Sequence, residues 1–148
     1  MAVIVVEFDV PVDPLTQVTG FELGHVTLQW NGGAHSSRQL GSRGLLMGYP
    51  AVADMLDGVV ALSADPGASY VFTGISSGWG FAVRRTRRHG LQVSTLAGRP
   101  LCQTSEADYA VAVWRGARQL LTARTPVEGA PLTDLQTAVA AFPDAYRR

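Results

Sequence analysis

Lysine is absent from this chain of 148 residues, and its twelve permanently cationic side chains are all arginines. The absence excludes the lysine of a phosphate-binding P-loop, and it excludes any mechanism that uses a lysine Schiff base or a lysine nucleophile. Cysteine occurs once, at Cys102, so an internal disulfide and a CxxC metal or redox site are also excluded. Hydrophobic residues make up 47% of the chain and charged residues 16%, which favours a folded globular protein over disorder.

Long apolar runs are missing as well. No stretch approaches the ~20 apolar residues that span a bilayer. The apolar start of the chain is interrupted by Glu7 and Asp9 and has no basic residue before Arg38, which is not typical of a secretory signal. The single cysteine fits a reducing compartment. We therefore expect a cytoplasmic protein that forms one domain over residues 1–148 and does not contact a membrane.

Alternation of apolar and polar residues predicts several short strands. In the first, Ile4, Val6 and Phe8 share one face. Short strands joined by tight turns favour antiparallel pairing. The expected strands are 2–10, 21–30, 69–75, 79–86 and 90–96, with one more short strand about Leu101 and Cys102, whereas 31–44 is expected to be a loop or a poorly ordered strand.

Helical periodicity predicts three helices. The clearest covers 106–123, where Ser105 and Asp108 approximate a capping box. Another begins at Pro50, and the last covers 133–142 with Thr133 as its N-cap. The expected fold class is α+β: a curved antiparallel sheet of about five or six strands, with the long helix packed on one face and two shorter helices.

The segment 74–78 matches the GxSxG pattern, with Ser76 in the position of a nucleophile. That pattern carries catalysis where a strand turns into a helix. Here the residues that follow have the alternation of a strand, so a hairpin turn is the favoured interpretation. The sequence therefore predicts no catalytic residue at this motif.

The strongest charge cluster is the run of arginines at 84, 85, 87 and 88, close to Trp79 on a glycine-rich turn. A basic hairpin end can bind an acidic partner, or it can simply be a solvated turn that keeps a sheet from pairing with another chain. Nucleic acid is disfavoured because the chain has no net charge. If a partner binds here, we expect Arg84, Arg85, Arg87 and Arg88 at the contact surface and Trp79 as its anchor.

The charges are divided unevenly along the chain. Residues 1–83 hold two arginines and seven acidic residues, a net charge of −5, and residues 84–148 hold ten arginines and five acidic residues, a net charge of +5. Such an asymmetry can steer a charged partner onto one half, or it can favour head-to-tail self-association. The alternative is that the charges interleave in space within one sheet.

Acid–base chemistry could come from four residues. Glu7 and Asp9 lie two apart on one strand face, where one carboxylate can raise the pKa of the other. His25 and His35 could be neighbours across a turn. A metal site needs three or four convergent ligands, and no spacing in the chain supplies them, so no metal and no cofactor is expected.

A resemblance bears on residues 55–121. This segment contains Leu-Asp-Gly, Tyr-Val-Phe-Thr-Gly, Ser-Ser-Gly-Trp-Gly-Phe, the arginine-rich turn and Ala-Val-Trp-Arg-Gly-Ala-Arg. In this pattern it resembles small actinobacterial proteins, some of which are thought to be immunity proteins encoded beside toxins. The resemblance supplies no catalytic motif and implies a binding role.

Three functions follow as hypotheses. The first is a small cytoplasmic protein-binding module, of immunity type, that binds a protein partner through a charged surface. The second is a small cyclase or isomerase that works in a cavity and uses Glu7, Asp9, His25 or His35 as acid–base groups. The third is a self-associating structural protein, so the chain is expected to be a monomer or a homodimer.

Overall fold

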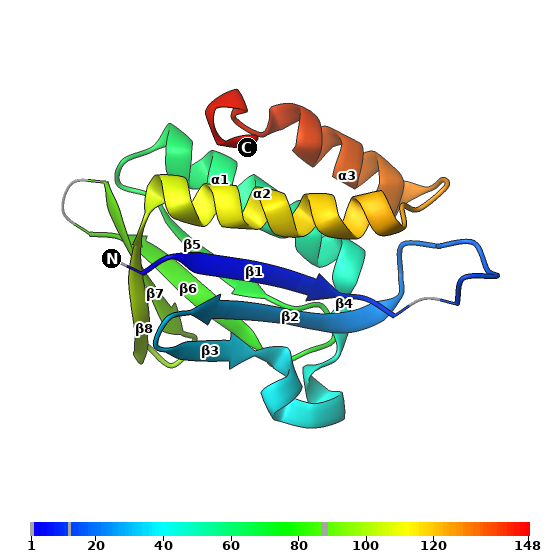
Figure 1. Cartoon of the computed structure of the whole chain (residues 1–148), viewed down its shortest axis with the longest axis horizontal. Coiled ribbons are helices and arrows are strands. Elements are labelled where there is room, and N and C mark those ends of the chain that lie inside the picture. Colours follow the sequence, from blue (N-terminus) through cyan, green and yellow to red (C-terminus); the bar gives the residue numbers. More distant parts are fainter. Residues whose placement is uncertain (1, 12, 87–88) are drawn as a thin grey trace.

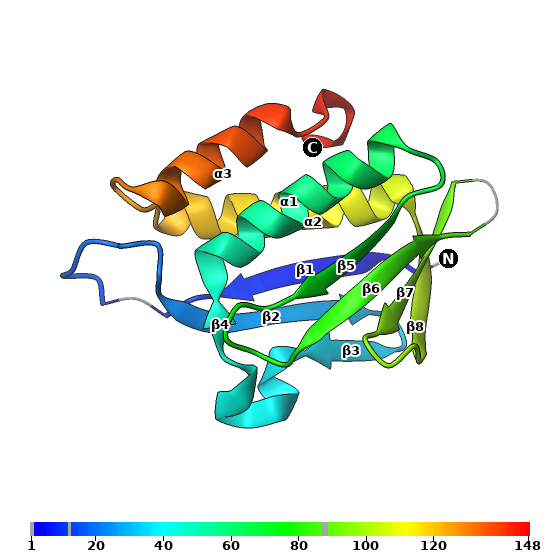
Figure 2. The same cartoon turned by 180° about the vertical axis from the view of Figure 1, so that it is seen from behind.

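The computed structural model describes residues 2–11, 13–86 and 89–148, and their strands form two antiparallel sheets below a layer of helices (Figures 1 and 2). In the first sheet, β2 pairs with each of the three other strands. The second sheet has the sequential order β5-β6-β7-β8. The strands are β1 (Ile4–Asp9), β2 (Leu23–Trp30), β3 (Gly33–Ser36), β4 (Leu46–Met47), β5 (Ser69–Thr73), β6 (Gly80–Arg85), β7 (Gly90–Thr95) and β8 (Pro100–Ser105).

The α+β class and the antiparallel pairing are confirmed, but the single sheet of five or six strands is wrong because the described strands divide into two sheets of four. The strands that the sequence did not define are β3 and β4. β3 lies within 31–44, where a loop or a poorly ordered strand was expected, and β4 follows at 46–47, where no strand was predicted; both are too short to show a clear alternation. Asn31 and Gly32 form the two-residue turn that joins β2 to β3, a dipeptide typical of tight hairpins.

The helices are α1 (Gly48–Ala64), α2 (Glu106–Ala123) and α3 (Ala130–Ala141), with short 3-10 helices η1 (Ser37–Gly44) and η2 (Asp144–Tyr146). The predicted bounds and N-cap of α2 are confirmed, since the Ser105 hydroxyl accepts a hydrogen bond from the Asp108 amide at 3.0 Å. The predicted start of α3 is wrong. It begins three residues earlier, with Gly129 as its N-cap and Pro131 in its first turn, while the Thr133 hydroxyl donates to the Gly129 carbonyl.

Two glycines let the helices approach the strands closely. A Cβ at Gly116 of α2 would lie 2.5 Å from the carbonyl oxygen of Val6 on β1. A Cβ at Gly58 of α1 would lie within 2.7 Å of the Tyr70 ring on β5. Glycine in a helix interior is less favourable than alanine by about 1 kcal/mol. At these two positions that cost is accepted because only glycine permits the close packing. The helices and both sheets thereby share one hydrophobic core.

A few polar contacts join distant segments. Nε2 of His35 on β3 lies 2.9 Å from the Gly80 carbonyl on β6, which links the two sheets. The Ala2 amide donates to the Gln103 carbonyl, so the start of the chain lies beside β8. Among the described residues, the helices are too short or too polar to cross a membrane.

Candidate functional site

The β6–β7 hairpin differs from the partner surface that the sequence predicts. Arg87 and Arg88 lie outside the described residues. Arg84 is exposed and donates to Oε1 of Gln92 on the neighbouring strand at 2.9 Å. Arg85 is directed inward instead: its side chain is 13% exposed, and its Nη2 lies 2.6 Å from Oε1 of Glu106. Arg85 is therefore a structural residue that is not available to a partner.

Trp79 also lies in the interior, not on the surface. It is 3% exposed and stacks on His35 with a centroid separation of 4.8 Å. Its other neighbours are the rings of Phe72 and Phe81. The expected interface anchor is thus part of the core. The glycine-rich turn before β6 holds Ser76 and leads into a strand, so the helix that a GxSxG nucleophile needs is replaced by β6.

His35 is buried beside Trp79, and it therefore lies apart from the other predicted acid–base residues. It is 8% exposed, and Nε2 donates to the Gly80 carbonyl when it carries the proton of the neutral ring. Burial lowers the pKa of His35 below its usual value, and Arg99 lowers it further, against the opposing effect of the Gly80 hydrogen bond. His35 is a neutral core residue.

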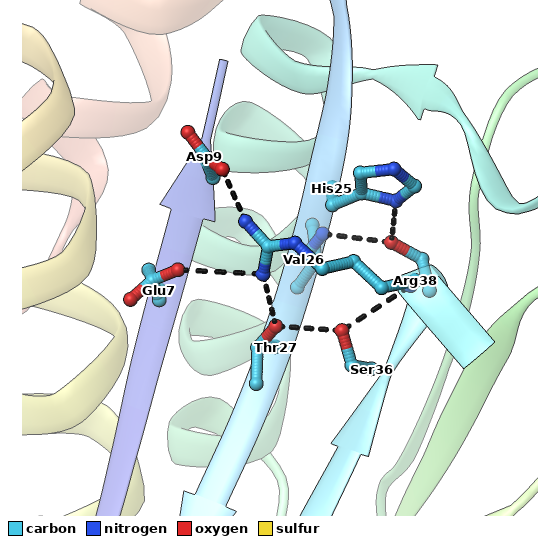
Figure 3. A network of polar contacts seen from close by, with 8 residues as sticks. Glu7, Asp9, His25, Val26, Thr27, Ser36 and Arg38 are labelled. Carbon is cyan, nitrogen blue, oxygen red and sulfur yellow. Dashed lines mark hydrogen bonds and ion pairs between the residues drawn. The ribbon is translucent and has the colours of Figure 1, made fainter. Parts of the chain in front are cut away.

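The other three predicted residues do come together, around Arg38 of η1 (Figure 3). Arg38 forms ion pairs with Glu7, at 3.5 Å, and with Asp9, both on β1. It also donates to the Thr27 hydroxyl at 3.3 Å. The three charged side chains are between 45% and 58% exposed, so this Arg38 network lies on the open outer face of the first sheet.

His25 joins the Arg38 network from β2. Its Nδ1 lies 2.8 Å from the Ser37 hydroxyl, which also accepts a hydrogen bond from the Val26 amide at 3.0 Å. A serine beside a histidine is the geometry of an activated nucleophile. Ser37, however, has no exposed surface, so a substrate cannot reach its oxygen. Burial and the charge of Arg38 lower the pKa of His25, although Asp9 acts in the opposite direction.

The Arg38 network therefore has limited chemical capacity. The carboxylates of Glu7 and Asp9 share one guanidinium, that of Arg38, and the hydroxyl nearest the imidazole is buried. Glu7 and Asp9 border a shallow groove beside Gln119 of α2, of about 430 Å³, which is open to solvent. General acid–base catalysis favours groups whose pKa is tuned in an enclosed site. The network instead ties η1 to the first sheet.

A second polar region lies on the outer side of α2 and was not singled out by the sequence. We call it the arginine pocket. It has a volume of about 750 Å³ and is lined by Trp114, Arg115, Arg118, Gln119, Thr122, Arg147 and Arg148. Four of the ten arginines in residues 84–148 meet here, and the described lining contains no acidic side chain.

Aromatic stacking and hydrogen bonds hold the arginine pocket in place. Trp114 stacks on Phe142, with centroids 5.0 Å apart, and the guanidinium groups of Arg147 and Arg118 lie 5.1 and 5.8 Å from the Trp114 ring centre. Arg147 also donates to the Val139 carbonyl at 2.6 Å at the end of α3. Cations over a tryptophan ring are attracted by its π-electrons, so two of the four arginines have a defined position.

The C-terminal arginines reach the pocket through contacts of the last residues with α2. Nε of Arg115 donates to the backbone carbonyl of Arg148 at 3.1 Å. At the start of α2, the Glu106 carboxylate accepts a hydrogen bond from the Tyr146 hydroxyl and also pairs with Arg85. Burial by itself raises the pKa of Glu106, but hydrogen bonds from Tyr146 and Arg85 outweigh it, and the pKa is lowered. Glu106 is thus an anion that fastens the segment after α3.

Four like charges in one concave site create a strong positive potential. Arg147 pairs with the Asp144 carboxylate at 3.2 Å, and Arg115 donates to the main-chain oxygen of Arg148. Guanidinium groups bind carboxylates and phosphates with two parallel hydrogen bonds. The chemistry of the arginine pocket is therefore that of an anion-binding site.

One part of this pocket could have been found from the sequence. Arg115 and Arg118 are three residues apart, so they lie on the same face of the predicted helix, beside Trp114. Arg147 and Arg148 are about thirty residues away, and the packing of α3 on α1 and of η2 on α2 brings them there.

Other assignments find no support. Among the residues that the structure describes, no three histidine, cysteine or acidic side chains are grouped to hold a metal ion. No family model matches the sequence, and neither the curated proteins nor the solved structures give a match. The immunity-type resemblance therefore stays a prediction.

Proposed function

We propose that this chain is a small protein-binding module that holds an acidic segment of a partner protein in the arginine pocket. The observation that carries the proposal is the convergence of four guanidinium groups on one pocket whose lining has no acidic side chain. The charged surface expected from the sequence is retained in this proposal, but it moves from the β6–β7 hairpin to α2 and the C-terminal residues.

The lining favours carboxylates of a protein over the backbone of a nucleic acid. Arg115 and Arg118 offer planar donors for carboxylate groups, and Gln119 and Thr122 add neutral hydrogen-bonding groups. A nucleic-acid site usually combines a basic domain with several exposed aromatic rings. Here the chain has zero net charge and one aromatic residue lines the pocket.

The resemblance to immunity-type proteins suggests the biological setting. An immunity-type protein acts by binding a toxin, and a compact cationic pocket would suit an acidic segment of such a partner. We place this binding in the cytoplasm, as the sequence predicts. The proposal requires no cofactor, metal or catalytic residue.

Charge reversal in the arginine pocket tests the proposal. The probe is a fluorescently labelled oligoglutamate peptide, whose binding at low salt is followed by fluorescence anisotropy. The double variant Arg115→Glu/Arg118→Glu should weaken binding roughly tenfold or more, a loss of about 1.4 kcal/mol.

The matched control is Arg84→Glu/Arg99→Glu, which changes the net charge equally at two exposed arginines outside the pocket. It should retain most of the affinity. Equal losses in the two double variants would show that the peptide responds to net charge alone, and the proposed pocket would be rejected.

A further inference from the structure

The arginine pocket opens into a second groove, lined mostly by apolar residues, between α2 and the start of the chain; we call it the apolar groove. The two share Arg115, Gln119 and Arg148. The apolar groove has a volume of about 320 Å³. Its apolar lining comes from Val3, Ile4, Val5 and Val6 on one side and from Ala107, Val111 and Ala112 of α2 on the other.

Two valines make the rim of this groove unusual for an outer strand face. Val3 and Val5 are 63% and 55% exposed, whereas Glu7 and Asp9 occupy the same face further along β1. A single exposed apolar residue is ordinary. Here two neighbouring valines face outward and border the apolar groove. Because that groove is continuous with the arginine pocket, the combined surface has an apolar end and a cationic end.

The backbone of β1 is not available for strand addition. Ile4 and Val6 are 4% and 3% exposed, and a Cβ at Gly116 would lie 2.5 Å from the Val6 carbonyl oxygen. α2 therefore covers this edge of the sheet. A ligand in the apolar groove must be recognised through its side chains, not by extending the sheet.

The charges along α2 indicate how a ligand would lie. Asp108 borders the apolar groove at the end opposite Arg115, and it would repel a carboxylate there. The groove follows α2 from Ala107 to Gln119, a rise of roughly 18 Å, the length of about five extended residues. A bound segment of that length reaches from the valines to the arginines.

We infer that the partner segment is amphipathic: apolar side chains lie against Val3 and Val5, and carboxylates a few residues away meet Arg115, Arg118 and Arg148. This inference rests on the proposed function, because it assigns the ligand class of the same pocket. It adds that the acidic segment binds more tightly when a short apolar stretch precedes or follows its carboxylates.

Two labelled peptides separate the two contributions. One is the oligoglutamate peptide, and the other has the same length but carries leucines in place of the glutamates of one half. The unmodified protein should bind the leucine–glutamate peptide several-fold more tightly, although that peptide carries fewer charges. Val5→Ser should reduce this affinity roughly threefold and leave oligoglutamate binding unchanged.

Val71→Ser is the matched control, since Val71 is a 58% exposed strand valine on the other sheet. It should change neither affinity, and circular dichroism melting of each variant checks that it folds. The inference is overturned if the two peptides bind equally or if Val5→Ser and Val71→Ser act alike. It is also overturned if sedimentation shows a dimer that Val5→Ser dissociates, because the occupant is then a second copy.

The proposed function fails by a different result. If Arg115→Glu/Arg118→Glu leaves both peptides bound, the arginine pocket is not the anion site. If the charge reversal weakens binding but the leucine–glutamate peptide binds no more tightly than oligoglutamate, the arginine pocket is retained as the anion site and the amphipathic ligand is rejected.

Discussion

A single charged side chain, Arg85, links three parts of this fold. It hydrogen-bonds to the Leu62 carbonyl near the end of α1 and pairs with Glu106 at the start of α2. Glu106 in turn accepts a hydrogen bond from the hydroxyl of Tyr146 on η2. The side chains of Arg85 and Glu106 are 13% and 17% exposed, so loss of either charge would leave the other poorly solvated.

Glu106→Gln tests this role. Removal of one partner of a largely buried ion pair leaves a poorly compensated charge, and we expect a loss of about 2–3 kcal/mol in the free energy of unfolding. Urea unfolding at neutral pH measures it. Asp144→Asn is the control, because Asp144 pairs with Arg147 but is 97% exposed, and it should cost less than about 1 kcal/mol. Similar losses in both variants would contradict the assignment.

His35 predicts a pH dependence of stability. Burial lowers its pKa in the folded chain below the ordinary 6.5, so the unfolded chain takes up a proton first as the pH falls. The contribution of His35 to the free energy of unfolding is therefore present above pH 6.5 and is lost as the pH drops below that value.

His35→Gln keeps a donor for the Gly80 carbonyl and removes the titration. The variant should lose less stability than the original protein when urea unfolding is repeated between neutral pH and about pH 5. Parallel pH curves for the two proteins would show that His35 does not titrate with unfolding.

Among the elements, α1 and α2 each depend on one glycine, a residue of low helix propensity. Gly58→Ala and Gly116→Ala should each destabilise the protein by about 1–3 kcal/mol, because the added methyl meets the Tyr70 ring or the Val6 carbonyl. Helix propensity alone predicts a gain of about 1 kcal/mol. Gly78→Ala is the control, since nothing lies within 4 Å of its added Cβ. A stabilised Gly116→Ala would contradict the close approach of α2 to β1.

The same elements show what local patterns can and cannot predict. α2 was predicted correctly because its apolar stripe is long and Ser105 caps it. β3 was left open between a loop and a poorly ordered strand, and β4 was missed, because both are too short to show alternation. The division into two sheets depends on long-range contacts, such as the one between His35 and Gly80, which no local pattern contains.

The candidate site divides in the same way. The spacing of Glu7 and Asp9 correctly placed them on one strand face, where Arg38 joins them. By contrast, the burial of Arg85 and Trp79 and the meeting of Arg115 with Arg148 are decided by tertiary packing. Residue type alone therefore could not show that Arg85 and Trp79 are directed inward.

For the whole molecule, the arginine pocket predicts stabilisation by polyanions. A ligand present at 100 times its dissociation constant adds about 2.7 kcal/mol to the stability of the folded state, which raises the melting temperature by about 5–10 °C for a protein of this size. Differential scanning fluorimetry with the oligoglutamate peptide measures the shift. Added salt should reduce it by screening, and an undiminished shift in Arg115→Glu/Arg118→Glu would contradict the assignment.

The most direct test of the central claim uses the three tryptophans as reporters. Trp114 lines the arginine pocket, Trp79 is buried beside His35, and Trp30 ends β2 in the first sheet. In a ¹⁵N-labelled sample titrated with the oligoglutamate peptide, the indole N–H signal of Trp114 should shift progressively to saturation while those of Trp79 and Trp30 stay in place. A titration that moves the Trp30 or Trp79 signal and leaves Trp114 unchanged would contradict the account.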